Sequence, residues 1–182
     1  GSTFKLFVYT EAMNQGLTPC DKRRDEYFSM QVFDKKAGKE VTWTPTNANG
    51  SFSGDSVPLM SAFARSINSV AVRLGMEMGV SRIAETAHKM GIESPLDETP
   101  SLPLGSSDVN LLELANAYST VANDGKYVKR VLVTRIVDRN GKEVYKAPLN
   151  EEQVIPYKSA FLMQQMLMGG TREPGGTSMS LN

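Results

Sequence analysis

The chain has 182 residues with 20 basic and 20 acidic side chains, so it carries no formal net charge and we do not expect nucleic acid as a partner. Its one cysteine, Cys20, permits neither an internal disulfide nor a cysteine-based metal site, and no pattern of residues predicts a metal or a cofactor. No apolar run is long enough to cross a membrane, and the length suits one domain with one core.

The first predicted element is a helix over residues 3–15, ending at Gly16. Ser2 has the chemistry of an N-cap, and Lys5 follows three positions later, so both side chains lie one turn apart on one face. A lysine amine placed there can take the proton of a serine hydroxyl if burial or nearby cations lower its pKa. A plain N-cap followed by a solvated lysine explains the same pair.

An irregular stretch follows to about Asp55, because LTPCDKRRDEYFSM and TWTPTNANGSFSG contain the breakers of loops and short extended pieces. Helices are then predicted over 57–65 and 69–78, separated by a break at Ser66-Ile67-Asn68. In a locally extended turn, side chains two positions apart point to the same side, so Ser66 and Asn68 can share one cleft. A helix C-cap followed by an N-cap is an equally good interpretation.

The rest of the chain predicts three more helices and one hairpin. The helices cover 81–90, 109–123 with Asp108 as cap, and a final segment that Pro156 begins at its first turn. Alternating residues over 131–137 predict a strand that pairs with 142–145 across an Asn140-Gly141 turn. The fold class is therefore α+β, dominated by helices with a β-hairpin.

A Ser-x-x-Lys motif with a later Ser-x-Asn is typical of penicillin-binding proteins and β-lactamases. The text around these motifs is more specific than the motifs. SGDSVPLMSAFARSINSVAVRLGMEMG resembles the second-motif region of class A penicillin-binding proteins, the bifunctional peptidoglycan synthases of bacteria. PSLPLGSSDVNLLELANAYSTVANDGKYV and RIVDRNGKEVYK resemble later segments of that family, in the same order. The resemblance implies the helical part of a β-lactamase/transpeptidase-like, serine penicillin-recognising fold.

The resemblance also implies roles for four residues. Ser2 would attack the carbonyl of a D-alanyl-D-alanine peptide, and an amine of a second peptide would resolve the acyl-enzyme. Lys5 would be the base, and Ser66 would relay a proton between Lys5 and the departing amine. Asn68 would bind the substrate amide and hold Lys5. The implied partners are peptidoglycan stem peptides and β-lactam antibiotics.

The third motif of the family, Lys-[Thr/Ser]-Gly, does not occur in the sequence. Lys158-Ser159-Ala160 comes closest, but its surroundings have helical spacing. The resemblance therefore implies that residues 1–182 are a partial transpeptidase domain, which starts at Ser-x-x-Lys and ends before the third motif with the central sheet largely missing. Because the third-motif strand supplies half of the oxyanion hole, we expect impaired activity of this piece.

The class A resemblance further implies a membrane-anchored parent protein with a glycosyltransferase domain, located at the periplasmic face of the inner membrane. Two other functions are compatible with the sequence. One is a serine β-lactamase-like hydrolase, and the other is a non-catalytic binding module in which Ser2 and Lys5 are structural. Intact-protein mass after incubation with penicillin separates a stable adduct, a transient adduct and no adduct.

Overall fold

The structure is a computed structural model that describes residues 1–34 and 37–181. Most of its regular structure is helical. The α-helices are α1 (Lys5–Asn14), α2 (Leu59–Ala64), α3 (Asn68–Met78), α4 (Val80–Lys89), α5 (Leu111–Ala122) and α6 (Tyr157–Arg172), and the short 3₁₀ helices are η1 (Ser2–Phe4), η2 (Leu102–Leu104) and η3 (Met179–Leu181). In the described part of the chain, no helix is both long and apolar enough to cross a membrane.

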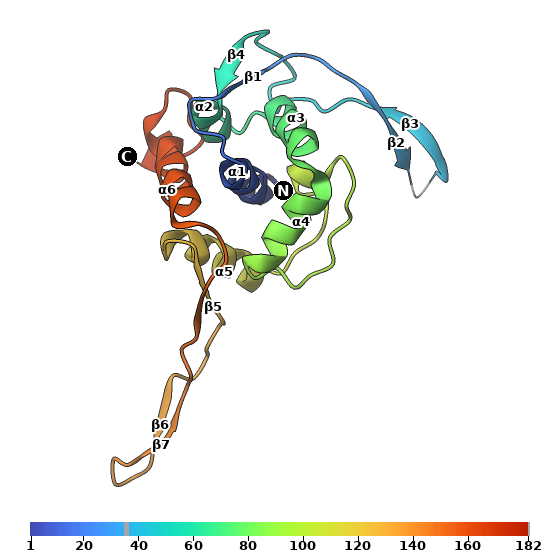
Figure 1. Cartoon of the computed structure of the whole chain (residues 1–182). Coiled ribbons are helices and arrows are strands. Elements are labelled where there is room, and N and C mark those ends of the chain that lie inside the picture. Colours follow the sequence, from blue (N-terminus) through green and yellow to red (C-terminus); the bar gives the residue numbers. More distant parts are fainter. Residues whose placement is uncertain (35–36, 182) are drawn as a thin grey trace.

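Helix α1 lies at the centre of the molecule, and the other α-helices surround it (Figure 1). It contacts α3, α4 and α6. Every residue from 5 to 13 is buried, so the helix has no solvent-facing side. A helix enclosed in this way needs no polar stripe, which explains why KLFVYTEAMN lacks one. The central position of α1 fixes Lys5 inside the protein.

The strands of the described residues form four separate two-stranded antiparallel sheets. The pairs are β1 (Lys22–Arg24) with β4 (Ser56–Pro58), β2 (Met30–Asp34) with β3 (Lys39–Trp43), β5 (Lys126–Val128) with β8 (Glu151–Gln153), and β6 (Arg135–Val137) with β7 (Glu143–Lys146). No wider sheet occurs among these residues. The predicted helix-dominated α+β class is confirmed.

The hairpin β6–β7 is shorter than the sequence predicts. Pairing begins at Arg135, opposite Lys146, whereas the segment 131–134 lies outside the strand. The turn is confirmed, since Gly141 has a φ of 81° and its N–H donates to the main-chain oxygen of Asp138. The hairpin extends away from the helices (Figure 1), and Leu132 is 96% exposed. Residue alternation predicts a strand over the whole of 131–137, but Leu132 and Val133 are exposed and do not pair with a second strand.

A second hairpin, β2–β3, forms where the sequence predicts only loop and short extended pieces. Met30 pairs with Trp43, and Val32 pairs with Val41. Both strands carry β-branched and aromatic residues, which favour strands. The prolines and glycines elsewhere between Gly16 and Asp55 favour loops, and for this reason the strands were not predicted.

Three predicted helix starts are wrong in detail. The N-cap of α5 is Asn110, whose Oδ1 accepts from the N–H of Leu112 at 2.8 Å, and not Asp108. Ser2 is the first residue of η1 and makes no capping hydrogen bond. Pro156 stands at the cap position of α6, one residue before its first turn. Several short polar side chains near a helix start can each serve as the cap. The path of the preceding loop decides which one does, and the sequence does not show that path.

Candidate active site

Lys5 lies at the centre of the candidate site. Its side chain is 2% exposed, and its Nζ donates to the main-chain oxygen of Ser66 at 2.7 Å, to Ser66 Oγ at 2.9 Å and to Asn68 Oδ1 at 2.6 Å. No acidic side chain of residues 1–34 or 37–181 forms an ion pair with it. Burial lowers the pKa of Lys5 from its ordinary 10.5 to about 8. This buried, hydrogen-bonded lysine is unlike the solvated lysine of the alternative interpretation.

The turn that carries Ser66 and Asn68 joins α2 to α3. The N–H of Ile67 donates to the main-chain oxygen of Ala62 at 2.9 Å, which closes the end of α2, and the Ile67 side chain enters the core. Ser66 has a φ of 55°, in the left-handed region that residues with a Cβ seldom adopt. Such a conformation costs about 1–2 kcal/mol. It allows the carbonyl and the hydroxyl of Ser66 to contact Lys5 together.

Asn68 is the first residue of α3 and does not cap the helix with its side chain. Its Oδ1 accepts from Lys5, and its Nδ2 donates to the main-chain oxygen of Thr46 at 2.8 Å. The interpretation of Ser66 and Asn68 as a simple pair of helix caps is therefore wrong for Asn68. Its amide connects the buried lysine to a loop that precedes α2.

Ser2 lies one turn before Lys5, in η1, with its side chain exposed. The main-chain N–H of Lys5 donates to the Ser2 carbonyl, which makes η1 and α1 one continuous coil. Within the described residues, no hydrogen bond involves the Ser2 hydroxyl. The structure thus joins Lys5, Ser66 and Asn68 by direct hydrogen bonds and places Ser2 one turn before Lys5, with no side-chain hydrogen bond to any of the three. The role of Ser2 stays a prediction.

Two contacts hold η1 against the rest of the protein. The Gly1 amine donates to the main-chain oxygen of Gly105 at 2.6 Å, and the Tyr118 hydroxyl donates to the main-chain oxygen of Thr3 at 3.0 Å. These residues come from the loop after η2 and from α5. Ser2 lies between the two attachment points.

Sequence reasoning missed a group of polar residues around Asp25. The carboxylate is 3% exposed and accepts from Ser69 Oγ at 2.6 Å, from Asn47 Nδ2 at 2.7 Å and from the N–H of Ser53 at 3.0 Å. Burial acts to raise the pKa of Asp25, but the hydrogen bonds from Ser69, Ser53 and Asn47 outweigh it and hold that pKa below its usual value. No sequence spacing links these residues. The only signal was the Asn- and Ser-rich composition of the loop.

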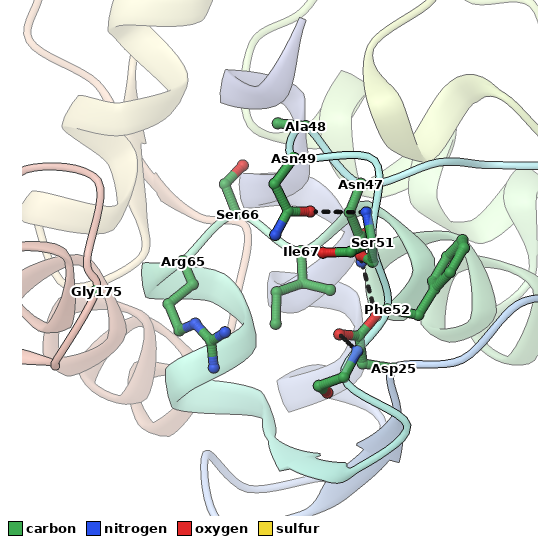
Figure 2. A pocket seen from close by; sticks show the side chains of 11 residues that line it. Asp25, Asn47, Ala48, Asn49, Ser51, Phe52, Arg65, Ser66, Ile67 and Gly175 are labelled. Carbon is green, nitrogen blue, oxygen red and sulfur yellow. Dashed lines mark hydrogen bonds between the residues drawn. The ribbon is translucent and has the colours of Figure 1, made fainter.

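A cavity of about 410 Å³ lies beside the turn. Ser66, Ile67 and Arg65 line one part of it, and the loop that contains Asn49 and Phe52 lines another. In Figure 2, Arg65 lies on one side of Ile67 and Phe52 on the other. Of the four predicted site residues, Ser66 lines this cavity. Nowhere in the described part of the chain do three or more His, Cys, Asp or Glu side chains gather that could hold a metal ion.

Comparison with known proteins gives consistent matches. A family model described as "Penicillin binding protein transpeptidase domain" matches residues 1–180. Penicillin-binding protein 2D of Bacillus subtilis (strain 168) is 33% identical over 168 residues, which cover 92% of this chain and 24% of that protein. Penicillin-binding protein 1A of Neisseria gonorrhoeae is 32% identical over 178 residues, covering 94% of this chain and 22% of that protein.

Among solved structures, penicillin-binding protein 1A from Haemophilus influenzae superposes with a TM-score of 0.84 at 24% identity. The match covers 100% of this chain and 32% of that chain. The chain therefore spans about a quarter of the length of the curated relatives it matches and about a third of this structural neighbour.

Proposed function

Because the chain belongs to the penicillin-binding protein transpeptidase domain family, we propose that it carries the nucleophile and the second motif of a D,D-transpeptidase. Family membership supports a transpeptidase that binds β-lactams. The structural match confirms the serine penicillin-recognising fold, and the curated relatives confirm the resemblance to class A penicillin-binding proteins. The substrate, the serine mechanism and the role of each residue belong to the proposal.

The observation that carries the proposal is the environment of Lys5. An amine that is 2% exposed, has no ion-pair partner in the described part of the chain and has a pKa near 8 can be neutral at physiological pH. A neutral amine has two N–H groups for the three acceptors around Lys5, so one of the three bonds opens when Lys5 loses its proton. With its lone pair free and an exposed serine one turn earlier, the amine is suited to take the proton of that serine. Purely structural lysines are rarely buried without a carboxylate.

In the proposed acylation, Ser2 Oγ attacks the carbonyl carbon of the D-alanyl-D-alanine bond, and its proton passes to Lys5 Nζ. When the carbon–nitrogen bond breaks, the departing amine takes a proton that Ser66 Oγ donates, and Ser66 recovers one from Lys5 at 2.9 Å. An amine of a second stem peptide then attacks the ester carbonyl carbon, the carbon–oxygen bond to Ser2 breaks, and the proton that the amine loses returns to Ser2 Oγ. Lys5 holds Asn68 Oδ1, and one N–H of Nδ2 donates to Thr46, so Asn68 would bind the substrate through the second N–H of Nδ2.

We also propose that residues 1–182 are part of a transpeptidase domain whose Lys-[Thr/Ser]-Gly motif comes from another segment of the full-length protein. The closest tripeptide, Lys158-Ser159-Ala160, lies within α6, and Ser159 is buried, so it cannot serve as a strand motif. Class A membership supports an extracytoplasmic location, and a glycosyltransferase domain and a membrane anchor in the parent protein extend this proposal.

The test is the intact mass of the full-length protein during incubation with penicillin. A stable adduct of one penicillin is the expected result. A transient adduct indicates a β-lactamase-like hydrolase, and no adduct indicates a binding module; either outcome contradicts the proposal. Ser2→Ala should abolish the adduct, whereas Ser180→Ala, which changes another exposed serine, should leave it intact. Undiminished labelling of the Ser2→Ala protein refutes the nucleophile assignment.

A further inference from the structure

The Asp25 carboxylate is buried beneath the Ser66–Asn68 turn without a cationic partner in the described part of the chain. One oxygen, Oδ1, accepts from both Ser69 Oγ and Asn47 Nδ2, and the other accepts from the N–H of Ser53. A buried charge is costly unless hydrogen bonds compensate it. An ionised carboxylate can only accept hydrogen bonds. The groups that surround the Asp25 carboxylate must therefore be donors, and these come from Ser69 of α3 and from Asn47 and Ser53 of the loop.

Asp25 and the main-chain oxygen of Ser51 together set the orientation of the Asn47 amide. Its Nδ2 donates to Asp25 Oδ1 at 2.7 Å and to the Ser51 oxygen at 2.9 Å, so its Oδ1 points the other way, toward the start of α3. There Oδ1 accepts from the main-chain N–H of Asn68 at 3.0 Å and of Ser69 at 3.1 Å. These are two of the N–H groups that have no partner inside a helix at its first turn. Asn47 thus caps α3 from a loop 21 residues earlier.

The orientation of the Asn68 amide is set by the same loop. Its Nδ2 donates to the main-chain oxygen of Thr46, the residue before Asn47, so its Oδ1 faces Lys5 Nζ. The main chain and the side chain of Asn68 are therefore both held by residues 46–47. If this loop segment moves, the acceptor that Asn68 offers to Lys5 moves with it.

We propose that Asp25 and Asn47 are positioning residues that orient Asn68 toward Lys5, acting through the cap of α3 and without touching the substrate themselves. The inference rests on the proposed function, because that function gives Asn68 and Lys5 their chemical roles. The geometric part of the inference is independent of activity and can be tested separately.

Two variants remove the network at different points. Asp25→Asn keeps the shape of the side chain but replaces one of its two acceptor oxygens with an NH2 group, so Ser69, Asn47 and Ser53 can no longer all donate to it. Ser69→Ala removes one donor to Asp25 and is the milder change. The matched control is Thr86→Val, because Thr86 Oγ1 donates to Glu11 Oε2 at 2.7 Å in a second buried hydroxyl–carboxylate bond, away from the turn. All three variants lose a buried hydrogen bond, but only the first two lie in the network.

The kinetic experiment measures penicillin acylation of the full-length protein and separates two quantities. The amplitude counts folded, reactive molecules, and the saturating rate constant reports the geometry of the site. Small misplacements of reacting groups cost about 10-fold to 100-fold in rate. We expect a loss of that size in the rate constant for Asp25→Asn and a smaller one for Ser69→Ala. Thr86→Val should change the amplitude or the melting temperature alone. Unchanged rate constants in both network variants overturn the proposal.

A double variant tests the direction of the bond. In Asp25→Asn combined with Asn47→Asp, the amide at position 25 can donate to the carboxylate at position 47, which still accepts from the two N–H groups of α3. The carboxylate loses the bond to the main-chain oxygen of Ser51, so the recovery is incomplete. We expect this reversal to restore part of the lost rate. Losses that simply multiply in the double variant contradict a direct coupling between the two positions.

Amide hydrogen exchange gives a readout that does not depend on penicillin. Asp25→Asn should speed exchange at the N–H groups of Asn68 and Ser69, and the Thr86→Val control should not. If the protein forms no penicillin adduct but this exchange pattern holds, the proposed function fails and the positioning network stands. If exchange at Asn68 and Ser69 is unchanged, the network does not orient the turn and the inference is wrong.

Discussion

Lys5 contacts Ser66 at two points, since its Nζ donates both to the main-chain oxygen at 2.7 Å and to Oγ at 2.9 Å. The two contacts differ in kind. The hydroxyl can rotate and exchange a proton, but the carbonyl is fixed by the backbone of the turn. In the proposed mechanism, the carbonyl would keep the amine in place while the hydroxyl is engaged with a substrate, so proton relay would not require Lys5 to move.

The rate of penicillin acylation should rise with pH through a midpoint near 8. Burial lowers the pKa of Lys5 to about 8, and the neutral amine is the base in the proposed mechanism, so the reactive fraction should grow as the pH rises. Between pH 7 and a plateau above pH 9 the acylation rate constant should increase about tenfold. Stopped-flow kinetics of the full-length protein with a chromogenic β-lactam measure it.

The control variant is Lys89→Ala, which removes an exposed lysine. Its acylation rate should rise with pH through the same midpoint as that of the unmodified protein. A flat profile between pH 7 and 9 means that Lys5 does not act as the base.

Ser66→Gly and Ser66→Ala should differ in stability while resembling each other in activity. Both lack the hydroxyl, so both should acylate roughly a hundredfold more slowly. Glycine adopts the φ of 55° freely, whereas alanine keeps the strain, so the glycine variant should be more stable by about 1 kcal/mol. Urea denaturation followed by fluorescence measures the difference. Equal stabilities would show that the left-handed turn relaxes when the hydroxyl is gone.

Gly75→Ala should destabilise the protein by about 1–3 kcal/mol. A Cβ at this position of α3 would lie 2.3 Å from Pro103 Cγ and 2.9 Å from Pro103 Cβ, so η2 must shift. Gly170→Ala in α6 is the control, because the nearest atom to its Cβ is 3.7 Å away. That variant should be neutral or gain up to about 1 kcal/mol from higher helix propensity. The melting temperatures of both variants test whether the contact between α3 and η2 leaves no room for a methyl group at position 75.

Asn110→Ala should cost about 1 kcal/mol, because the Asn110 side chain accepts from the N–H of Leu112 at the start of α5. Asp108→Ala should stay within about 0.5 kcal/mol of the unmodified protein. Chemical denaturation of the pair distinguishes the cap seen in the structure from the one that the sequence favours. The reverse order of effects would assign the cap to Asp108.

The helices and the three hydrogen-bonded site residues, Lys5, Ser66 and Asn68, could be predicted because their signals lie within short stretches of the sequence. Serine, lysine and asparagine at short spacings mark the two motifs, and helical periodicity marks the segments that carry them. Lys5 could not be predicted to be buried from α1 alone, because its burial depends on α3, α4 and α6 packing around it. The three hydrogen bonds of Lys5 result from that packing.

The roles of Asp25 and Asn47 could not be predicted from the sequence for a different reason. Their bonds to Ser69 and Asn68 span 44 and 21 residues and exist only after the loop has closed over the turn. Nothing in the residues near Asp25 distinguishes it from the neighbouring charged side chains of a solvated loop. For the hairpin the sequence predicted too much. Alternation over 131–137 predicts a strand along the whole segment, but pairing begins only at Arg135 and the apolar side chains before it are exposed.

The enclosure of α1 also determines the order in which the protein can fold. Its packing surfaces include Met163 and Met166 of α6, which a ribosome adds long after α1 has left the exit tunnel. Until then the side of α1 that faces α6 has no cover, and contacts so distant in sequence form slowly. The helix that carries Lys5 is thus made before its neighbours, and its packing is complete only once α6 has been made.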